Sequence, residues 1–240
     1  MTAGEAPIAD TLRGIDWRAI EASLDAEGWA RIPGLLRAAA CEGLARLYGP
    51  NPCFRSHVVM ARHGFGMGEY RYFSYPLPEP VSMLRSGFYA GLAPIANAWR
   101  RRLGGEEPFP ETLAAYLDRC HRAGQRRPTP LLLRYAAGDY NRLHQDLYGQ
   151  EAFPLQATIL LSRPGLDFTG GEFVLTEQRP RMQSRAMVVP LEQGDAVLFA
   201  VHRRPGAGAR GDYRVTMRHG VSKVHAGQRY ALGIIMHDAN

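Results

Sequence analysis

The stretch LLLRYAAGDYNRLHQD, residues 131–146, decides the fold and the chemistry of this chain. Residues 131–135 are mostly apolar or β-favouring and predict a strand. A second extended segment follows over residues 138–143 and leads into His144-Gln145-Asp146. Side chains two residues apart on extended backbone point to the same side, so His144 and Asp146 can face one metal ion.

The rest of the chain after residue 128 has the same sequence pattern, in which short β-favouring segments are separated by Gly, Pro and Asp. Strands are predicted over residues 155–162, 172–176, 196–201, 214–221 and 229–236. Several short strands with turn signals between them are typical of a double-stranded β-helix, or jelly roll.

The first half reads largely as helix. Asp16 can cap a helix that Gly28 ends, a short strand follows over residues 29–33, and further helices are predicted over residues 38–48, 79–103 and 111–122. Pro94 predicts a kink or a break in the longest of them. We therefore expect an α+β fold in one domain, residues 1–240. In it, helices of residues 1–128 buttress one face of a jelly-roll core formed by residues 129–240.

Composition narrows the class of protein. The 240 residues are 45% hydrophobic, and no apolar run reaches the roughly 18 residues of a membrane span. The N-terminus lacks the basic start and the apolar centre of a signal peptide. The three cysteines are widely spaced without a C-x-x-C pair, which argues against a disulfide framework or a zinc ribbon. We expect a cytoplasmic protein with no membrane partner; the sequence leaves the oligomeric state unknown.

The charge balance is basic, with a formal net charge of +6, and it favours anionic partners only weakly. Lys223 is the single lysine, a bias towards arginine that genome base composition can produce. Residues 177–229 hold ten basic residues against four acidic ones. They form either an electrostatic track for a nucleic-acid backbone or a solvated face whose charges do not line up.

A third metal ligand must come from elsewhere in the chain. His219, at the end of a predicted late strand, would complete a set of two histidines and one carboxylate with His144 and Asp146. That set leaves three metal positions open and indicates a non-haem Fe(II) oxygenase, in which a bidentate co-substrate and O2 take the open positions. His202 is the alternative, but ten residues after it stands Asp212 rather than a basic residue.

Arg229 lies ten residues after His219. We expect a turn at residues 226–227 to return Arg229 on the next strand beside His219, where its guanidinium would bind the distal end of a dicarboxylate. The other histidines need no such role: His225 should lie at the surface, His237 should be solvated or structural, and His121 sits near a helix end.

Taken together, residues 134–146, the GGEF segment at 170–173, residues 194–199, HGV at 219–221 and GQR at 227–229 resemble the 2-oxoglutarate/Fe(II) oxygenase superfamily. The resemblance covers about residues 129–238. It implies a jelly-roll core, iron(II) held by the two histidines and the aspartate, and 2-oxoglutarate held by Arg229. It also implies a hydrogen bond from Tyr135 to the co-substrate, although an ordinary core tyrosine would suit that position equally.

The whole chain also resembles a narrower bacterial group described as nucleic-acid-modifying, or damaged-DNA, oxygenases. The segments that carry this likeness are residues 55–75, with RYFSY at 71–75, residues 143–148 and residues 175–185. The resemblance implies oxidative demethylation of alkylated DNA or RNA, hence DNA repair. AlkB-type demethylases carry a second arginine shortly after the co-substrate arginine, and residues 230–236 contain none. The alternatives are therefore prolyl-hydroxylase-like hydroxylation of a protein side chain or small metabolite and, more distantly, a non-enzymatic jelly-roll binding module.

Residues 54–75 are rich in arginine, histidine, aromatic residues and glycine, and predict a loop or hairpin outside the core. As a lid over the metal, this stretch could stack a flipped base on Tyr72, Phe73 or Tyr75 and place Arg62 or Arg71 on phosphate. In the alternative, the aromatic rings pack against the long helix and the arginines are solvated.

Overall fold

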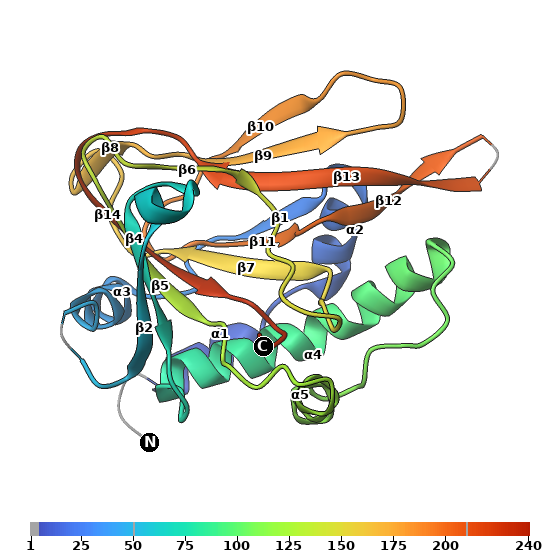
Figure 1. Ribbon diagram of the computed structural model, residues 1–240, viewed down its shortest axis with the longest axis horizontal. Helices are drawn as coiled ribbons and strands as arrows, with labels where there is room; N and C mark the ends of the chain where they lie inside the picture. Colours follow the sequence, from blue (N-terminus) through green and yellow to red (C-terminus); the bar gives the residue numbers. More distant parts are fainter. Residues whose placement is uncertain (1–4, 50, 210) are drawn as a thin grey trace.

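Two antiparallel sheets lie face to face, and helices gather on the outer side of the larger one (Figure 1). The computed structural model describes residues 5–49, 51–209 and 211–240. Within them, no helix combines the length and the apolar character needed to cross a membrane. The layered mixture of helices and sheets is the α+β architecture that the sequence predicts.

The larger sheet runs in the order β1 (Trp29–Ile32), β11 (Ala196–Ala200), β7 (Leu155–Leu160), β14 (Val224–Ile234), β5 (Leu131–Ala136), β4 (Glu69–Phe73) and β2 (Phe54–Val59), with β8 (Phe168–Gly170) paired to β14. The smaller sheet runs in the order β10 (Arg185–Val189), β9 (Phe173–Gln178), β13 (Gly211–Val221), β6 (Tyr140–His144) and β3 (Gly66–Met67), with β12 (Arg203–Gly208) paired to β13. Since β13 and β14 are consecutive but lie in opposite sheets, the late strands enclose a space between the sheets.

The helices are α1 (Glu5–Arg13), α2 (Trp17–Glu27), α3 (Ala38–Arg46), the short 3-10 helix η1 (Met60–His63), α4 (Glu79–Arg102) and α5 (Leu113–Arg122). As predicted, the Asp16 carboxylate caps α2 by accepting hydrogen bonds from two backbone amides, and Gly28 ends it with a φ of 79°. The predicted break at Pro94 is wrong, because α4 continues through that residue. α1 was not predicted.

The larger sheet has an apolar layer on each face. Its outer face packs on the helices in the main core, which includes Leu24, Phe88, Trp99 and Leu232. Its inner face packs on the smaller sheet through a second cluster that surrounds the space between the sheets. All six residues of β7 are buried, as expected of a strand covered on both faces, although Gln156 and Thr158 among them are polar.

The stretch of residues 54–75 is a hairpin, as one of the two predictions had it, but it is not outside the core. β2 and β4 pair with each other and add two strands to the edge of the larger sheet through the pairing of β4 with β5. Phe73, at the end of β4, is fully buried against the helices. The prediction that the stretch lies outside the core is therefore wrong for this residue.

The predicted turn at residues 226–227 is wrong as well. β13 ends at Val221 and β14 begins at Val224, so the turn comes earlier, and residues 226–227 pair with β8. A Cβ on Gly227 would lie 2.0 Å from the carbonyl oxygen of Asp167. This glycine permits two strands to approach closely and does not mark a turn. As a result, His219 and Arg229 face each other from opposite sheets.

Candidate active site

The backbone pairing of β6 with β13 brings two of the predicted metal ligands together. His144 is the direct partner of His219 in this ladder, and Asp146 follows two residues after the end of β6. The Nε2 atom of His144 lies 3.5 Å from Asp146 Oδ1, and the Nε2 atom of His219 lies 3.3 Å from Asp146 Oδ2. One ligand atom from each of the three residues falls within 4.8 Å of the others, close enough to bind one ion.

Hydrogen bonds orient this cluster. The Nδ1 atom of His144 lies 2.7 Å from the carbonyl oxygen of Arg142, so Nδ1 carries a proton and Nε2 is the ring nitrogen directed at Asp146 and available to a metal ion. Gln145, between the two ligands, donates its side-chain amide to the carbonyl oxygen of Met217 at 2.7 Å and fixes β6 against β13. The ring of Phe199 packs 4.6 Å from the ring of His219, measured between centroids.

The electrostatics of the cluster suit a divalent cation. Burial opposes ionisation of Asp146, yet its hydrogen bonds with His144 and His219 hold the pKa of this carboxyl well below its usual range. Burial, reinforced by the nearby His144, lowers the pKa of His219 and favours its neutral form. An ionised carboxylate beside imidazole lone pairs is the donor set that a metal ion requires.

Arg229 occupies the other end of the same space. It lies on β14 opposite Tyr135 of β5, and only 1% of its surface is exposed. Its guanidinium lies 5.5 Å from the ring centroid of Tyr135 and 5.9 Å from that of Phe168. No hydrogen bond or ion pair joins it to any residue that the structure describes, and its Nε is a buried donor without a partner. A buried, unpaired cation is costly, so this site fits an anionic ligand.

A single cavity of about 370 Å³ joins the cluster to Arg229. Its lining includes all five predicted metal and co-substrate residues: His144, Asp146, His219, Arg229 and Tyr135. Tyr135 is buried and its hydroxyl accepts a hydrogen bond from Asn141 at 3.4 Å. Burial raises the pKa of Tyr135 to about 12, so the phenol is neutral and its O–H can donate to a ligand. The cavity thus combines a metal site, a buried cation and a neutral donor.

The cavity also contains polar groups that the sequence analysis did not single out. Tyr148 donates its hydroxyl to Asp146 Oδ1 at 2.8 Å. Gln156, on β7, has a buried side-chain oxygen without a hydrogen-bond partner among the described residues. The spacing of Tyr148, two residues after Asp146, is a signal that could have identified it. Gln156 stands in an apolar strand and gives no such signal.

The five residues predicted to touch substrate do not lie together. Tyr72 lines the cavity, whereas Phe73 points into the helix-facing core because neighbouring residues of a strand point to opposite faces. Arg71 also points away from the cavity, with its guanidinium 5.3 Å from the ring centroid of Tyr48. Arg62 is exposed on η1.

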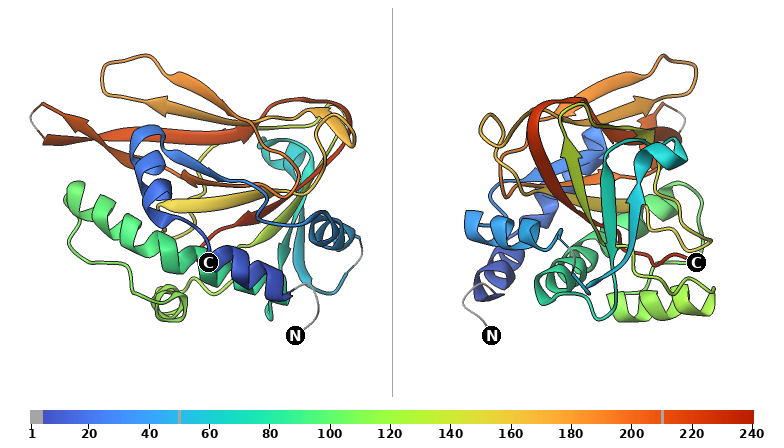
Figure 2. Two further views of the ribbon diagram at one scale, coloured as in Figure 1. Left: turned by 180° about the vertical axis from the view of Figure 1, so that it is seen from behind. Right: turned by 60° about the vertical axis from the view of Figure 1, so that its left-hand side comes forward.

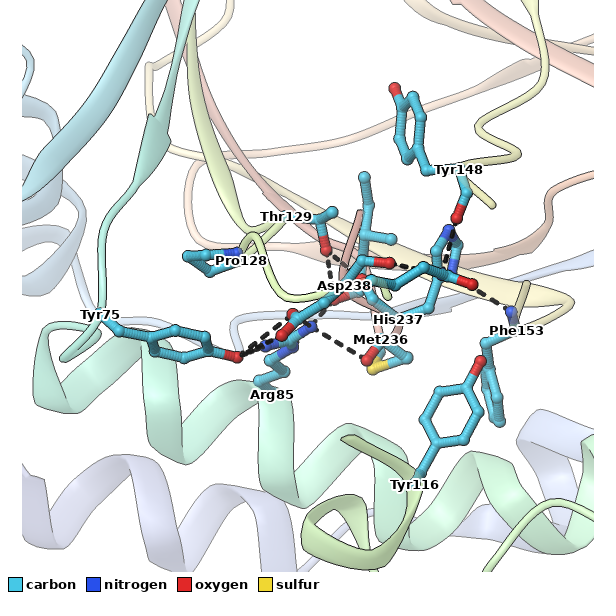
Figure 3. A network of polar contacts seen from close by, with 12 residues as sticks. Tyr75, Arg85, Tyr116, Pro128, Thr129, Tyr148, Phe153, Met236, His237 and Asp238 are labelled. Carbon is cyan, nitrogen blue, oxygen red and sulfur yellow. Dashed lines mark hydrogen bonds and ion pairs between the residues drawn. The ribbon is translucent and has the colours of Figure 1, made fainter. Parts of the chain in front are cut away.

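Tyr75 belongs to a different network. Its hydroxyl donates to Asp238 at 3.0 Å and accepts from Arg85 at 2.8 Å, on the side where the chain ends (Figure 3). The structure therefore separates Phe73, Arg71 and Tyr75 from the cavity, and it leaves Tyr72 as the member of the predicted set that lines it.

The remaining histidines lie outside the cluster. The three-residue group contains His219 and not His202. His225 is exposed, as predicted. His237 is 1% exposed and accepts a hydrogen bond from the backbone amide of Phe153, so the solvated position considered for it is wrong and the structural one is right.

The basic residues between 177 and 229 do not form one track. Arg204 and Arg229 are buried, and the buried carboxylate of Glu177 pairs with Arg179, Arg185 and Arg204. The hairpins β9–β10 and β12–β13, which carry much of the stretch, project beyond the rest of the molecule in separate arms (Figure 2). Several of these charges therefore serve the fold.

Comparison with known proteins identifies the family of this chain. The family model described as an oxygenase catalysing oxidative methylation of damaged DNA matches residues 68–239. The chain is also 48% identical over 167 residues to the Mycobacterium tuberculosis proteins named Uncharacterized protein Rv2227 and MT2286, covering 70% of this chain and 72% of each relative. The chain belongs to this oxygenase family and is an oxidoreductase.

Solved structures share the fold at low sequence identity. A prolyl hydroxylase from Trichoplax adhaerens, in complex with a hypoxia inducible factor peptide fragment, matches with a TM-score of 0.58 at 16% identity, over 97% of this chain and 92% of that one. A 2OG-Fe(II) oxygenase family protein from Burkholderia pseudomallei matches with a TM-score of 0.55 at 18% identity, over 95% of each chain. This likeness confirms the predicted double-stranded β-helix core. Family, fold and His-Asp-His cluster fit Fe(II), 2-oxoglutarate and O2.

Proposed function

We propose that this chain is a dioxygenase in which His144, Asp146 and His219 hold iron(II) and Arg229 holds 2-oxoglutarate, and that it oxidatively demethylates alkylated nucleic acid. The observation that carries the co-substrate assignment is the buried guanidinium of Arg229, which has no partner in the part of the chain that the structure describes and shares a cavity with the metal cluster. A dicarboxylate would supply the missing anion at one end and ligand oxygens at the other.

The residues of the chain then have separable roles. When bound, iron(II) with O2 couples decarboxylation of 2-oxoglutarate, to succinate and CO2, to the insertion of one oxygen atom into a substrate C–H bond. Arg229 binds the distal carboxylate through its paired N–H donors, and Tyr135 donates its hydroxyl to the same co-substrate. The two sheets exclude water around these groups, because the second apolar cluster surrounds the cavity.

The nucleic-acid substrate is supported by the family description and by the mouth of the cavity. Phe65 and Leu143 line the mouth and are about half exposed, with the Phe65 ring stacked on His63. Exposed Arg142, whose backbone amide donates to the carbonyl oxygen of Phe65, forms no ion pair within the described ranges. Aromatic surface beside an exposed cation suits a base with its phosphate.

Oxidation accounts for removal of a methyl group and not for its addition. Hydroxylation of an N-methyl group gives an N-hydroxymethyl product, which breaks down to formaldehyde and the free N–H of the base. We therefore interpret the family's activity on damaged DNA as demethylation.

Hydroxylation of a protein side chain or a small metabolite is the second candidate. It is favoured by the absence of a further arginine in residues 230–236, which continue β14 and the chain beyond Arg229. This candidate predicts the gain of one oxygen atom by the substrate without release of formaldehyde.

The deciding experiment is an anaerobic titration with iron(II) and 2-oxoglutarate, followed by turnover on oligonucleotides that carry N-methylated bases. Demethylation requires equal amounts of succinate and formaldehyde, both abolished in His144→Ala and retained in the exposed control His225→Ala. Normal consumption of 2-oxoglutarate by His144→Ala would overturn the metal assignment. Turnover of 2-oxoglutarate with hydroxylated peptide and no formaldehyde would overturn the substrate.

A further inference from the structure

The carboxylate of Asp146 is held by more than its histidine neighbours. We infer that Tyr148, supported by Tyr72, is a positioning residue that fixes the orientation of Asp146 for metal binding. This inference rests on the proposed function, since it takes Asp146 to be a metal ligand. Nothing in the family description or in the names of the relatives assigns a role to either tyrosine.

The contacts form a short chain of donors that ends on the carboxylate. Tyr72 donates its hydroxyl to the hydroxyl oxygen of Tyr148 at 3.3 Å, and Tyr148 donates to Asp146 Oδ1 at 2.8 Å. The other carboxylate oxygen, Oδ2, lies 3.3 Å from the Nε2 of His219. The two oxygens of Asp146 are therefore distinguished before any ion binds: Oδ1 accepts from a phenol and also lies 3.5 Å from the Nε2 of His144, whereas Oδ2 faces His219.

Both phenols are fixed donors. A phenol hydroxyl ordinarily has a pKa of about 10, so at neutral pH both hydroxyls carry a proton to donate. The guanidinium of Arg55 lies 4.5 Å from the ring centroid of Tyr72, and its Nε donates to the carbonyl oxygen of Pro128 at 2.9 Å. The ring of Tyr70 packs against the same ring edge-on at 5.3 Å. Tyr72 is thus held from several sides and can hold Tyr148 in turn.

The backbone of Tyr148 is anchored independently of its hydroxyl. The fully buried Gln125 donates its side-chain amide to the carbonyl oxygens of Tyr148 at 2.8 Å and of Asp238 at 2.6 Å. Its side-chain oxygen accepts from the backbone amide of Glu151 at 2.7 Å. Figure 3 shows Tyr148 beside His237 and Asp238 in this network. The loop that carries Asp146 is therefore held by its backbone, and removing the phenol hydroxyl alone would leave the loop in place.

Removal of that hydroxyl frees one carboxylate oxygen to rotate. A ligand carboxylate that has lost its outer hydrogen bond binds metal less tightly, typically by about 10- to 100-fold. We expect Tyr148→Phe to weaken iron(II) binding by about ten-fold or more, and Tyr72→Phe to weaken it less, because Tyr72 acts through Tyr148.

The test compares Tyr148→Phe and Tyr72→Phe with Tyr89→Phe. Tyr89 is the control for loss of a phenol hydroxyl, because its hydroxyl likewise donates one hydrogen bond, to the carbonyl oxygen of Pro110 at 2.7 Å, but contacts no group of the cavity. Metal affinity is measured anaerobically with iron(II) alone and with cobalt(II), whose visible absorption reports the geometry of its ligands. The expected result is weaker binding and an altered cobalt(II) spectrum in Tyr148→Phe, with wild-type behaviour in Tyr89→Phe.

Asp146→Asn separates this inference from the proposed function. If Asp146→Asn bound both metals like the wild-type protein, Asp146 would not be a ligand and the proposed function would fail. If Asp146→Asn lost metal while Tyr148→Phe kept wild-type affinity and spectrum, only the positioning role would be wrong. Equal weakening in Tyr148→Phe and Tyr89→Phe would also overturn it, since the loss would then be a general effect of removing a buried hydroxyl.

Discussion

Arg85 and Arg229 are equally buried, each 1% exposed, and their surroundings could hardly differ more. Arg85, on α4, donates to the carboxylate of Asp238 at 2.8 Å, to the hydroxyl of Tyr75 at 2.8 Å and to two backbone carbonyls at 3.0 Å (Figure 3). Arg229, on β14, lies against the rings of Tyr135 and Phe168 and makes no hydrogen bond or ion pair with the described residues; the carboxylate of Glu172 acts on it only through longer-range charge. The guanidinium of Arg85 finds its hydrogen-bond partners within the protein, whereas that of Arg229 finds none among the described residues.

The difference separates a charge that the fold satisfies from one that the proposed co-substrate would satisfy. Taking a charge out of water costs several kcal/mol unless partners replace the lost hydration. Asp238 and its neighbours replace it for Arg85, so the pair ties the end of the chain to α4. Nothing in residues 5–49, 51–209 or 211–240 replaces it for Arg229. The fold therefore tolerates a cost at Arg229 that binding of an anion would recover.

The largest effect is expected from breaking the completed pair. Arg85→Met removes the guanidinium that pairs with the buried carboxylate of Asp238, leaves His121 as its remaining basic partner among the described residues, and should lower the free energy of unfolding by about 3–5 kcal/mol. Arg229→Met removes a charge that has no partner and should leave stability unchanged or raise it. Urea denaturation of the metal-free proteins measures both. An equal loss of stability in the two variants would mean that Arg229 stabilises the fold as Arg85 does, and it would contradict the distinction between the two arginines.

The region around Arg85 also predicts a pH dependence of stability. Burial, with a smaller contribution from Arg85, lowers the pKa of His237 from 6.5 to about 4 against the opposing charges of Asp146 and Asp238. Between these values the unfolded state binds a proton that the folded state rejects, so the stability present above pH 6.5 falls as the pH drops towards 4. The loss attributable to His237 should reach roughly 3 kcal/mol.

Substitution by a residue that does not titrate isolates this contribution. In His237→Gln the amide oxygen can still accept the hydrogen bond of the Phe153 amide, but no proton is bound in this range. The difference between the stabilities of wild type and variant should therefore shrink or reverse between pH 7 and pH 4. Parallel curves over that range would show that His237 does not titrate with unfolding.

Arg229, which is unpaired in the described part of the chain, predicts an effect on ligand binding that is similar in free energy to the effect of His237 on stability. Arg229→Met should weaken 2-oxoglutarate binding roughly 100-fold, because it removes a charge-assisted pair of hydrogen bonds in a buried site. Iron(II) affinity should not change, since the metal cluster lies on other strands. Arg229→Lys should recover part of the affinity, as it keeps the charge without the planar fork. Calorimetric titration of 2-oxoglutarate into the anaerobic metal complex distinguishes these outcomes, and unchanged affinity in Arg229→Met would place the co-substrate elsewhere.

Much of this cavity could be predicted because its signals are local. The two-residue spacing of His144 and Asp146 follows from the geometry of a strand, and the late strands were recognisable from composition. The turn between His219 and Arg229 was predicted at the wrong residues. Gly227 has the composition of a turn residue, but its missing side chain lets two strands approach closely. Both residues line one cavity, although they face each other across the sheets.

The buried ion pair of Arg85 with Asp238 could not be predicted from the sequence. Arg85 and Asp238 are 153 residues apart, and nothing in either neighbourhood marks a buried ion pair. Strand β4 shows the same limit on a smaller scale. Its aromatic residues looked alike in the sequence, but which of them face the cavity depends on the pairing of β4 with β5, and this places Tyr72 inside and Phe73 in the helix-facing core.

The smallest expected effect on stability and ligand binding comes from Gln156, a neutral side chain that, like Arg229, is buried in the cavity lining with a polar atom left unpaired within the part of the chain that the structure describes. The side-chain oxygen of Gln156 is also buried in the cavity lining without a partner among the described residues, but an unpaired amide costs less than an unpaired charge. Gln156→Leu should therefore leave stability within about 1 kcal/mol of wild type. If a ligand donates to this oxygen, the KM for that ligand should rise by up to about ten-fold, as expected for one neutral hydrogen bond. Comparing KM for 2-oxoglutarate with KM for a methylated oligonucleotide shows which of the two the amide contacts, whereas a marked loss of stability would reveal a structural role like that of Arg85.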